Sequence, residues 1–527
     1  MKKKNGIILQ PGAWNGIRPW ARALLSVVLF SMIGFQTRLS AQSTNDAVVY
    51  LDSVRQVIRG FGAANIRPWR PDMTAGEIQK AFGTGPGQIG FTILRLRVPP
   101  QTSDFALNVP TAQAAHSMGV TIIASPWSPP AGMKTNNNIV GGRLRETSYA
   151  EYAAHLKSFV DYMANNGVPL YAVSVQNEPD IQVTYESCDW NAAEMVRFVK
   201  DHGRNVGTKV IAPESFNFNP TIANAILNDP AAAQNVDIIG GHIYGGGLAP
   251  YPLAAAKGKE HWMTEHLELD TSWTAVLATG KEINDCMSVG MNAYIWWYIV
   301  RFYGPVLENG SVSKRGYVMS QFARFVRPGY VRVYNTLVPR RPVFVTAYKG
   351  DSKLVIVALN TSSTSLEQTI RFEGLPNGSA VLTPYVTTAT KNCVQENQVT
   401  VSNGNLTTML EASSITTFVA DGIASKVETP AHPQTFRLSQ NYPNPFNPST
   451  VIRFELPVSS RVSLNVFDVL GRKVASLIQG EMPAGYHEVG WDAHDAVSSI
   501  YFYRLEAGAA DREGIQFVDT RRMLLIR

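Results

Sequence analysis

Two patterns of hydrophobic and polar residues follow one another along the chain. From about residue 54 to 303, apolar runs rich in β-branched and aromatic residues alternate with segments whose apolar residues recur at helical spacing. The apolar runs predict eight strands, at residues 57–62, 91–98, 120–127, 170–178, 209–215, 236–244, 261–266 and 293–303. Eight strand–helix units in about 250 residues are typical of a (β/α)8 TIM barrel, which is an α/β fold. We therefore predict a barrel over residues 57–329.

Further along, alternation of apolar and polar residues replaces the helical spacing. Residues 330–421 contain several alternating runs separated by Gly, Asn and Ser, which predicts an antiparallel β-sandwich attached to the barrel. A short apolar run within residues 42–56 precedes the barrel and is expected to add a strand to this side domain. A polar, Pro-containing linker is predicted over residues 422–437, and alternating runs over residues 438–527 predict a small separate all-β sandwich.

The N-terminus accounts for the basic character of the chain. Residues 1–41 have a basic front, an apolar stretch at 23–35 and a small residue, Ala41, at a suitable cleavage point, which predicts a secretory signal peptide. The apolar stretch is short for a membrane span, although an uncleaved anchor stays as an alternative. Cleavage after Ala41 lowers the Lys and Arg count from 47 to 41, equal to the 41 Asp and Glu. The neutral mature chain predicts no nucleic-acid partner.

Cysteine and histidine spacing gives no sign of a metal or a cofactor. Cys188, Cys286 and Cys393 are widely separated, which excludes a disulfide-rich scaffold and a paired zinc motif. His242 has no second His at ligand spacing in its segment, so it is interpreted as a hydrogen-bonded site residue. The chain also has no Gly-rich phosphate loop and no Ser-centred elbow, and we expect no cofactor.

Candidate chemistry lies where the predicted barrel strands end. Asn177 and Glu178, in "SVQNEPD", end the fourth predicted strand, and Glu265, in "HWMTEH", ends the seventh. The loops at the C-terminal ends of barrel strands form the mouth, so the two carboxylates are expected to face each other there. Such a pair suits glycoside hydrolysis. A single Glu at a strand end is more often an ion-pair partner, and Glu214 is interpreted in that structural sense.

Aromatic residues are concentrated near the same strand ends. Their flat faces suit sugar rings, whereas packing in the barrel core is the alternative for about half of them. Adjacent residues on a strand point to opposite faces, so only one of Trp296 and Trp297 is expected to face the mouth. The aromatic candidates are Trp127, Tyr244, Trp296, Trp297, Tyr298 and Tyr303.

Six ordered motifs resemble one family of enzymes. They are "GFTILRLRVPP", "SPWSPPAGMK", "SVQNEPD", "GGHIYGG", "WMTEH" and the segment from "WWYIVRFYGP" to "ARFVRPGY". Together, over roughly residues 47–421, they resemble glycoside hydrolase family 30 and, within it, the bacterial glucuronoxylanase and xylanase branch. The resemblance implies a retaining enzyme with Glu178 as general acid/base and Glu265 as nucleophile.

The resemblance also implies substrate contacts. Asn177 corresponds to a residue that contacts the sugar 2-hydroxyl, Tyr244 to one beside the nucleophile, and Trp127 and Trp297 to walls of the glycone subsite. His242 is expected in the same site.

A glucuronate branch on xylan would be recognised by an Arg-x-Tyr element, Arg301 and Tyr303 here. Two departures from the branch weaken that expectation. The segment "HLELDTSW" lacks the usual Tyr and Ser contacts and brings in Glu268 and Asp270, and Val300 stands where relatives often have Arg.

The C-terminal region resembles a second family. The motifs "LSQNYPNPFNPSTVIRFELP", "VFDVLGRKVASL" and "SIYFYRL" are similar to the type A sorting domain of the type IX secretion system. The resemblance implies an outer-membrane type IX secretion machinery as partner and a secreted or cell-surface protein, exported across the inner membrane by the signal peptide. A carbohydrate-binding sandwich is the alternative.

The sequence therefore predicts a secreted retaining endo-β-1,4-xylanase that cleaves glucuronoxylan by double displacement. One alternative keeps the mechanism on another β-linked glycan, such as a glucan or galactan. A non-catalytic polysaccharide-binding protein is a third hypothesis, which the presence of both Glu residues disfavours.

Overall fold

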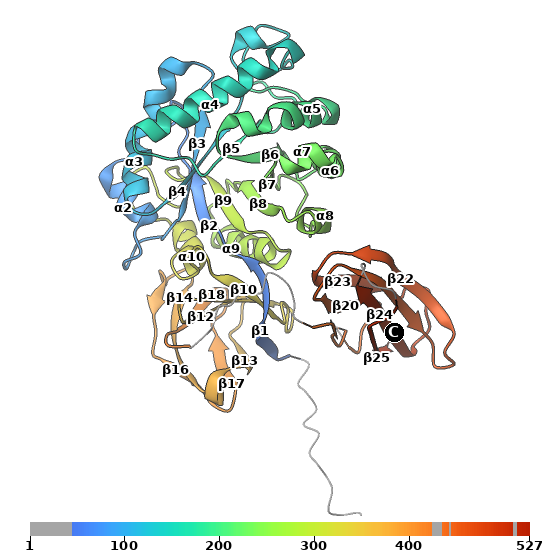
Figure 1. The fold of residues 1–527 in the computed structure, drawn as a ribbon. Helices are drawn as coiled ribbons and strands as arrows, with labels where there is room; N and C mark the ends of the chain where they lie inside the picture. Colours follow the sequence, from blue (N-terminus) through green and yellow to red (C-terminus); the bar gives the residue numbers. More distant parts are fainter. Residues whose placement is uncertain (1–44, 424–434, 442–443, 510–513, 527) are drawn as a thin grey trace, which may run out of the picture. The chain divides into compact units, whose positions relative to one another are not determined.

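The computed structural model describes residues 45–423, 435–441, 444–509 and 514–526 (Figure 1). The expected signal peptide and most of the expected linker lie outside these described residues. No helix within the described ranges is both long enough and apolar enough to cross a membrane.

Eight parallel strands close into a barrel, which confirms the predicted fold class (Figure 1). Each strand pairs with the next along the chain, and the last pairs with the first. The barrel strands are β2 (Gly60–Ala64), β3 (Ile93–Val98), β4 (Thr121–Pro126), β5 (Ala172–Ser174), β6 (Lys209–Ser215), β7 (Ile238–His242), β8 (Glu260–Glu265) and β9 (Ala293–Tyr298).

Nine α-helices in the described part lie between or after these strands. Local signals set several helix starts: Thr74 with Glu77, and Asn191 with Glu194, form capping boxes at the starts of two helices. The helices are α2 (Ala75–Phe82), α3 (Val109–Ser117), α4 (Tyr149–Asn165), α5 (Ala192–His202), α6 (Pro220–Asn228), α7 (Pro230–Gln234), α8 (Pro252–Ala256), α9 (Trp273–Ser288) and α10 (Lys314–Ala323).

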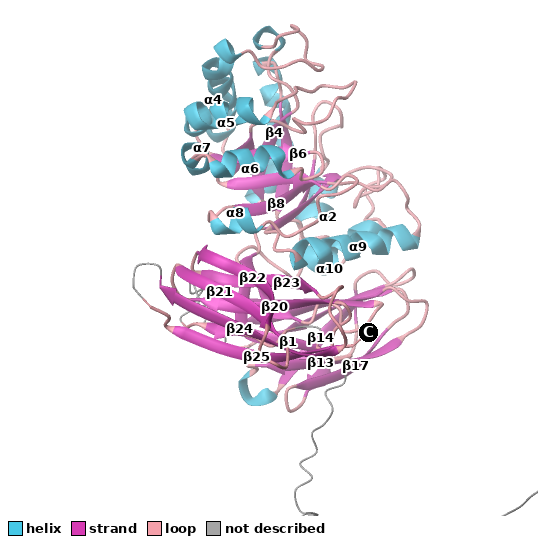
Figure 2. Ribbon diagram, turned by 90° about the vertical axis from the view of Figure 1, so that its right-hand side faces the viewer, coloured by secondary structure: helices cyan, strands magenta, loops and turns pink. Residues whose placement is uncertain are grey.

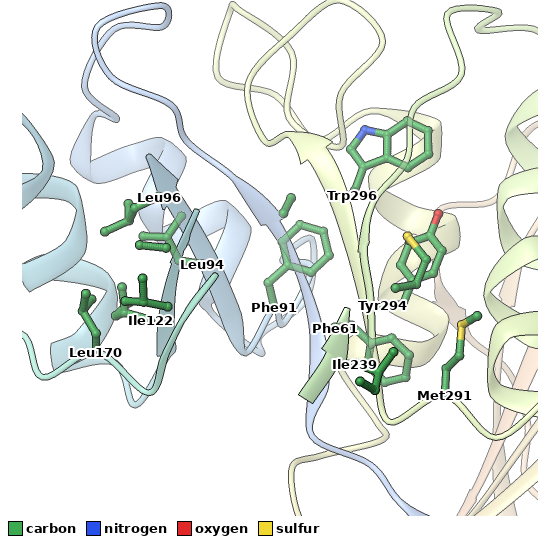
Figure 3. Close-up of a cluster of buried hydrophobic side chains, with 14 of the residues drawn as sticks. Phe61, Phe91, Leu94, Leu96, Ile122, Leu170, Ile239, Met291, Tyr294 and Trp296 are labelled. Carbon is green, nitrogen blue, oxygen red and sulfur yellow. The ribbon is translucent and has the colours of Figure 1, made fainter. Parts of the chain in front are cut away.

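Alternation along the barrel strands separates two apolar layers. Side chains that point to the helices, such as Leu94 and Ile122, join a large cluster that also contains Trp296 (Figure 3). Side chains that point inward form a smaller cluster inside the barrel. Its buried members are Ile93, Ile123, Ala172, Ile211, Ile238, Trp262, Ala293 and Ile295. Burial of each large aliphatic side chain contributes about 1.5–3 kcal/mol, so the two layers hold the strands and helices together.

A 10-stranded sheet forms the side domain. The strand before the barrel, β1 (Ala47–Val57), pairs antiparallel with β10 (Val331–Asn335) and parallel with β13 (Leu366–Glu373). Helix α10 contacts this sheet through Gln321, whose side chain donates to Thr387 Oγ1 at 2.7 Å. The other strands are β11 (Val343–Gly350), β12 (Lys353–Asn360), β14 (Ala380–Thr387), β15 (Val394–Gln395), β16 (Val399–Val401), β17 (Asn405–Leu410) and β18 (Ser414–Ala420).

The C-terminal region folds into two small sheets that share an apolar core. Alternation explains this: Val462, Leu464 and Val466 are buried while their neighbours along the strand are more exposed. The described α-helices all precede β10, and strands dominate the remaining chain (Figure 2). The strands are β19 (Arg437–Leu438), β20 (Ser449–Leu456) and β23 (Gly485–Asp492) in one sheet, and β21 (Ser460–Phe467), β22 (Lys473–Met482), β24 (Ser499–Ala509) and β25 (Phe517–Leu525) in the other.

The fourth and eighth barrel strands end at least four residues before their apolar runs do. The fourth was expected over residues 170–178, but β5 ends at Ser174, so Asn177 and Glu178 lie in the loop that follows it. Their backbone amides bond outside the ladder, from Asn177 N–H to Pro126 O at 2.8 Å and from Glu178 N–H to Glu214 O at 3.0 Å. The eighth strand ends at Tyr298 instead of continuing to residue 303.

Candidate active site

Three carboxylates reach the barrel mouth from positions where the backbone is irregular. Glu178 has φ 48° in the loop after β5, and Glu214 has φ 60°. The pairing of β6 with β7 shifts register between Pro213 and Ser215, at Glu214. The pairing of β7 with β8 shifts register just before Glu265. Such irregularities redirect a side chain that a regular strand would place elsewhere.

Arg95 on β3 contacts two of these carboxylates and Asn177 from inside the barrel. Its side chain is fully buried and donates from Nη1 to Glu265 Oε2 and from Nη2 to Asn177 Oδ1, both at 2.6 Å. The same Nη2 lies 3.1 Å from Glu214 Oε1. Arg95 was not among the predicted site residues. Its signal in the sequence is a pair of arginines, Arg95 and Arg97, inside an otherwise apolar buried strand.

His242 lies between the carboxylates, on the last residue of β7. Its Nδ1 is 2.9 Å from Glu178 Oε1, and its Nε2 is 3.9 Å from Glu214 Oε1 and 4.0 Å from Glu265 Oε2. Burial by itself lowers the pKa of His242, but the charge of Glu265, the hydrogen bond to Glu178 and the proximity of Glu214 raise the pKa to about 9. The imidazole is therefore cationic at neutral pH.

Glu265 is held at both oxygens. Tyr244 donates its hydroxyl to Oε1 at 3.0 Å while Arg95 occupies Oε2. Burial raises the pKa of the Glu265 carboxyl, and the positive charges of His242 and Arg95 oppose that rise. These two contacts fix the direction of the carboxylate and leave its charge partly balanced.

Glu214 acts as a buried counter-charge. Burial by itself raises the pKa of its carboxyl, but the charge of Arg95 and the contact with His242 lower the pKa to about 2. Glu214 is therefore ionised throughout the ordinary pH range. With Arg95 and His242 cationic, two of the three carboxylates are neutralised, and the cluster can hold one further proton without net charge.

Tyr185 is a second contact of Glu178 that the motifs did not indicate. Its hydroxyl donates to Glu178 Oε2 at 3.1 Å, and the side chain is half exposed on the loop between β5 and α5. Glu178 is thus held by His242 on one oxygen and by Tyr185 on the other.

The same cluster has the geometry of potential metal ligands. In the described residues, Glu178, His242 and Glu265 each offer one ligand atom, and these atoms lie within 4.8 Å of one another. Arg95 already donates to Glu265, and the cationic His242 lies between the two acids. A divalent cation would meet two positive charges there, so this donor set suits a proton better than a metal.

Aromatic rings surround the charged cluster. The Trp127 ring centroid is 4.8 Å from the Arg95 guanidinium carbon and 5.6 Å from the Trp297 centroid. Trp297 stacks on Tyr298 with centroids 4.4 Å apart. Trp297 packs against Trp127, and its centroid lies 5.9 Å from the Arg95 guanidinium carbon, whereas Trp296 is buried in the large cluster on the helix side. Trp297 is therefore the member of the Trp pair on the mouth side.

Arg301 and Tyr303 follow β9, and the Arg301 side chain forms an ion pair with Glu308 and not with one of the three clustered carboxylates. Arg301 donates from Nη1 to Glu308 Oε1 at 2.8 Å, and Tyr303 is buried. The buried Arg315 donates to the carbonyl oxygens of Tyr303, Glu268 and Asp270. It thereby holds the loop after Glu265 beside Tyr303.

The Asp270 carboxylate is used within its own loop. It accepts hydrogen bonds from the backbone N–H and the hydroxyl of Ser272 at the start of α9, and these bonds lower its pKa. The carboxylate therefore holds Ser272, the N-cap residue of α9, in position.

Comparison with known proteins places this geometry in a family. Residues 96–261 match the Glycosyl hydrolase family 30 TIM-barrel domain. A glucuronoxylanase from Bacillus subtilis (strain 168) is 42% identical over 395 residues, which cover 72% of this chain and 92% of the relative. The chain belongs to glycosyl hydrolase family 30. It is therefore a glycoside hydrolase, as predicted.

Solved family 30 structures share the fold. The subfamily 8 xylanase Xyn30A from Clostridium acetobutylicum is 39% identical with a TM-score of 0.68, covering 72% of this chain and all of that one (100%). A family 30 endoxylanase from Clostridium papyrosolvens C71 is also 39% identical, with a TM-score of 0.66 over 71% of this chain and 100% of that chain.

The C-terminal region matches a different family. Residues 440–513 match the secretion system C-terminal sorting domain, which confirms the predicted sorting domain and indicates a secreted or cell-surface protein.

Proposed function

We propose that this family 30 protein is a retaining endo-β-1,4-xylanase acting on glucuronoxylan, with Glu265 as nucleophile and Glu178 as general acid/base. The main supporting observation is that one oxygen of each Glu and a His242 nitrogen lie within 4.8 Å of one another. Retaining glycosidases hold their two carboxyls about 5–5.5 Å apart, whereas inverting enzymes leave about 6.5–9.5 Å for a water molecule. The close pair supports direct attack by one carboxylate.

In the first step, Glu265 attacks the anomeric carbon and Glu178 protonates the leaving oxygen. Arg95 and Tyr244 orient Glu265 through its two oxygens, and Tyr185 and His242 orient Glu178. In the second step, Glu265 carries a glycosyl ester and no longer a negative charge. That loss favours the ionised form of Glu178, which then accepts a proton from the attacking water.

The substrate assignment is supported by the glucuronoxylanase and xylanase relatives. We assign the xylan backbone to Asn177, Trp127, Trp297, Tyr244 and His242, which surround the two Glu residues. Arg301 and Tyr303 would contact the glucuronate branch, since a guanidinium fork suits a carboxylate.

The export route forms part of the proposal. Residues 1–41 would direct the chain across the inner membrane, and the C-terminal sheets would be recognised by the outer-membrane type IX secretion machinery. Removal of residues 438–527 should leave the enzyme inside the cell envelope, which fractionation of a producing strain would detect.

Product analysis tests the activity. Purified protein is incubated with methylglucuronoxylan, undecorated linear xylan, a β-glucan and a β-galactan, with mass spectrometry of the products. Proton NMR of early products gives the anomeric configuration. We expect xylo-oligosaccharides that retain the β configuration. Inversion would overturn the assignment of Glu265, and products only from the glucan or galactan would favour the alternative substrates.

A further inference from the structure

Arg70 meets Arg301 at the rim of the barrel. Strands β2 and β9 are neighbours in the barrel, so the loops that follow them share one side of the mouth. Arg70 lies in the loop after β2, and Arg301 in the segment after β9. Both guanidinium groups donate to the same atom, Glu308 Oε1, Arg70 Nη2 at 3.1 Å and Arg301 Nη1 at 2.8 Å.

Two tyrosines connect this pair of arginines with the mouth. The Arg70 guanidinium carbon lies 5.9 Å from the centroid of Tyr298, which stacks on Trp297. Burial raises the pKa of Tyr298 and of Tyr303 to about 12, and in both cases the charges of Arg70 and Arg301 oppose the rise while that of Glu265 adds to it. The arginines and the nucleophile therefore act on the same two hydroxyl groups.

The charge balance distinguishes this arrangement from a simple ion pair. The charges of Arg301 and Glu308 alone would cancel, so this ion pair would have no net positive charge to attract an acidic sugar. Arg70 adds a second positive charge to the single carboxylate, so the group of Arg70, Arg301 and Glu308 carries one net positive charge. The Nε–H of Arg70 is buried and has no hydrogen-bond partner within the described residues.

We propose that Arg70 is a further specificity-determining residue, which binds the carboxylate of an acidic sugar branch together with Arg301. This inference rests on the proposed function. Arg70 supplies the positive charge that the loop after Glu265 does not, since that loop presents Glu268 and Asp270. The sugar carboxylate takes a place beside Glu308, within reach of both guanidinium groups.

The test compares kcat/KM on methylglucuronoxylan with kcat/KM on linear xylan and follows the ratio of the two. We expect Arg70→Gln to lower this ratio about tenfold, the size of one lost charge-assisted hydrogen bond, mainly through KM. Arg70→Lys keeps the charge and should lower the ratio by less than about threefold. Added salt should reduce the wild-type ratio more than that of Arg70→Gln, because screening weakens a charge that the variant lacks.

The control is Arg204→Gln. Arg204 is likewise an arginine in an ion pair, 3.2 Å from Asp237, but it is more exposed than Arg70, and Asp237 precedes β7 at the opposite end of the barrel. Its ratio should equal that of the wild type, and melting temperatures verify that all variants are folded.

Three outcomes would go against the idea in distinguishable ways. An unchanged ratio in folded Arg70→Gln overturns the role of Arg70 and leaves the xylanase assignment intact. A wild-type ratio near one, with both polymers cut, shows that no acidic branch is recognised and also overturns it. No cleavage of either xylan by the wild type would instead contradict the proposed function.

Discussion

Two layers of the barrel interior are built from the same strands with opposite chemistry. Ile93 and Ile123 belong to the apolar inner layer, and two residues further along the same strands lie Arg95 and Ser125, which are hydrogen-bonded at 3.1 Å. The apolar layer requires only that every second side chain is aliphatic or aromatic. The mouth layer requires compensation, because each buried charge costs several kcal/mol unless it is paired.

The comparison explains where backbone strain occurs. Strand residues of the apolar layer follow the regular ladder, whereas Glu178 and Glu214 have positive φ and Glu265 follows a register shift. A non-Gly residue in such a conformation costs on the order of 1–3 kcal/mol and persists only when its surroundings enforce it. The apolar layer and the helices around the barrel supply that stability, and the mouth uses it to hold three carboxylates together.

The largest expected effect is a loss of activity, without loss of the fold, when either carboxylate of the mouth is replaced. Glu265→Gln should lower kcat at least about 10⁴-fold, because it removes the nucleophile, and Glu178→Gln about 10²–10⁴-fold, because it removes the acid/base. Initial rates on methylglucuronoxylan give kcat, and circular dichroism verifies the fold. Glu194→Gln, in the capping box at the start of α5, serves as the control with unchanged kcat. Full activity in either site variant would remove that residue from the mechanism.

The next effect tests the compensation of buried charge. Arg95→Leu should destabilise the barrel by about 3–5 kcal/mol, because it leaves Glu214 buried without its cation. The double variant Arg95→Leu with Glu214→Leu should regain most of the melting temperature but none of the activity, since Glu265 stays without its partner. Calorimetry of both variants checks this. A double variant no more stable than the single one would show that Glu214 is not the group Arg95 neutralises.

The pH dependence of stability is the third expectation. Because His242 has its pKa raised from 6.5 to about 9 in the folded protein, its stabilisation is fully present below pH 6.5 and is lost as the pH rises through 9. The shift corresponds to on the order of 3 kcal/mol for this fully buried group. Melting temperatures between pH 6 and 10 should fall for the wild type and change less for His242→Gln. Equal slopes for the two proteins would contradict the assigned charge state.

The smallest effect is expected in the apolar layer. Ile123→Val should cost about 0.5–1.5 kcal/mol, because it removes one methylene from a packed site, and should leave kcat unchanged. Denaturation midpoints and initial rates measure both quantities. A large loss of activity without loss of stability would mean that the apolar layer helps to position the catalytic residues at the mouth. The two layers would then no longer have separate roles.

Much of the candidate site could be predicted because its signals are local in sequence. Glu265 ends its predicted strand, and the motifs around Glu178 and Glu265 indicated the family that the comparisons confirm. Arg95 and Tyr185 were missed for different reasons. An arginine in an apolar strand gives no indication of its partners, and Tyr185 lies in a loop whose path depends on the whole mouth.

By itself the sequence determined the order and kind of the elements, since period-two and helical patterns follow from which side chains must leave water. It also determined which carboxylates stand near strand ends, and the alternation that makes the C-terminal region all-β. Only the tertiary structure decided that β5 stops at Ser174, that Glu178 and Glu214 take positive φ, and that Arg95, His242 and three Glu residues share one buried cluster. The physical reason is that a buried charge is stable only beside groups that compensate it. Here those groups come from separate strands that meet only when the barrel closes.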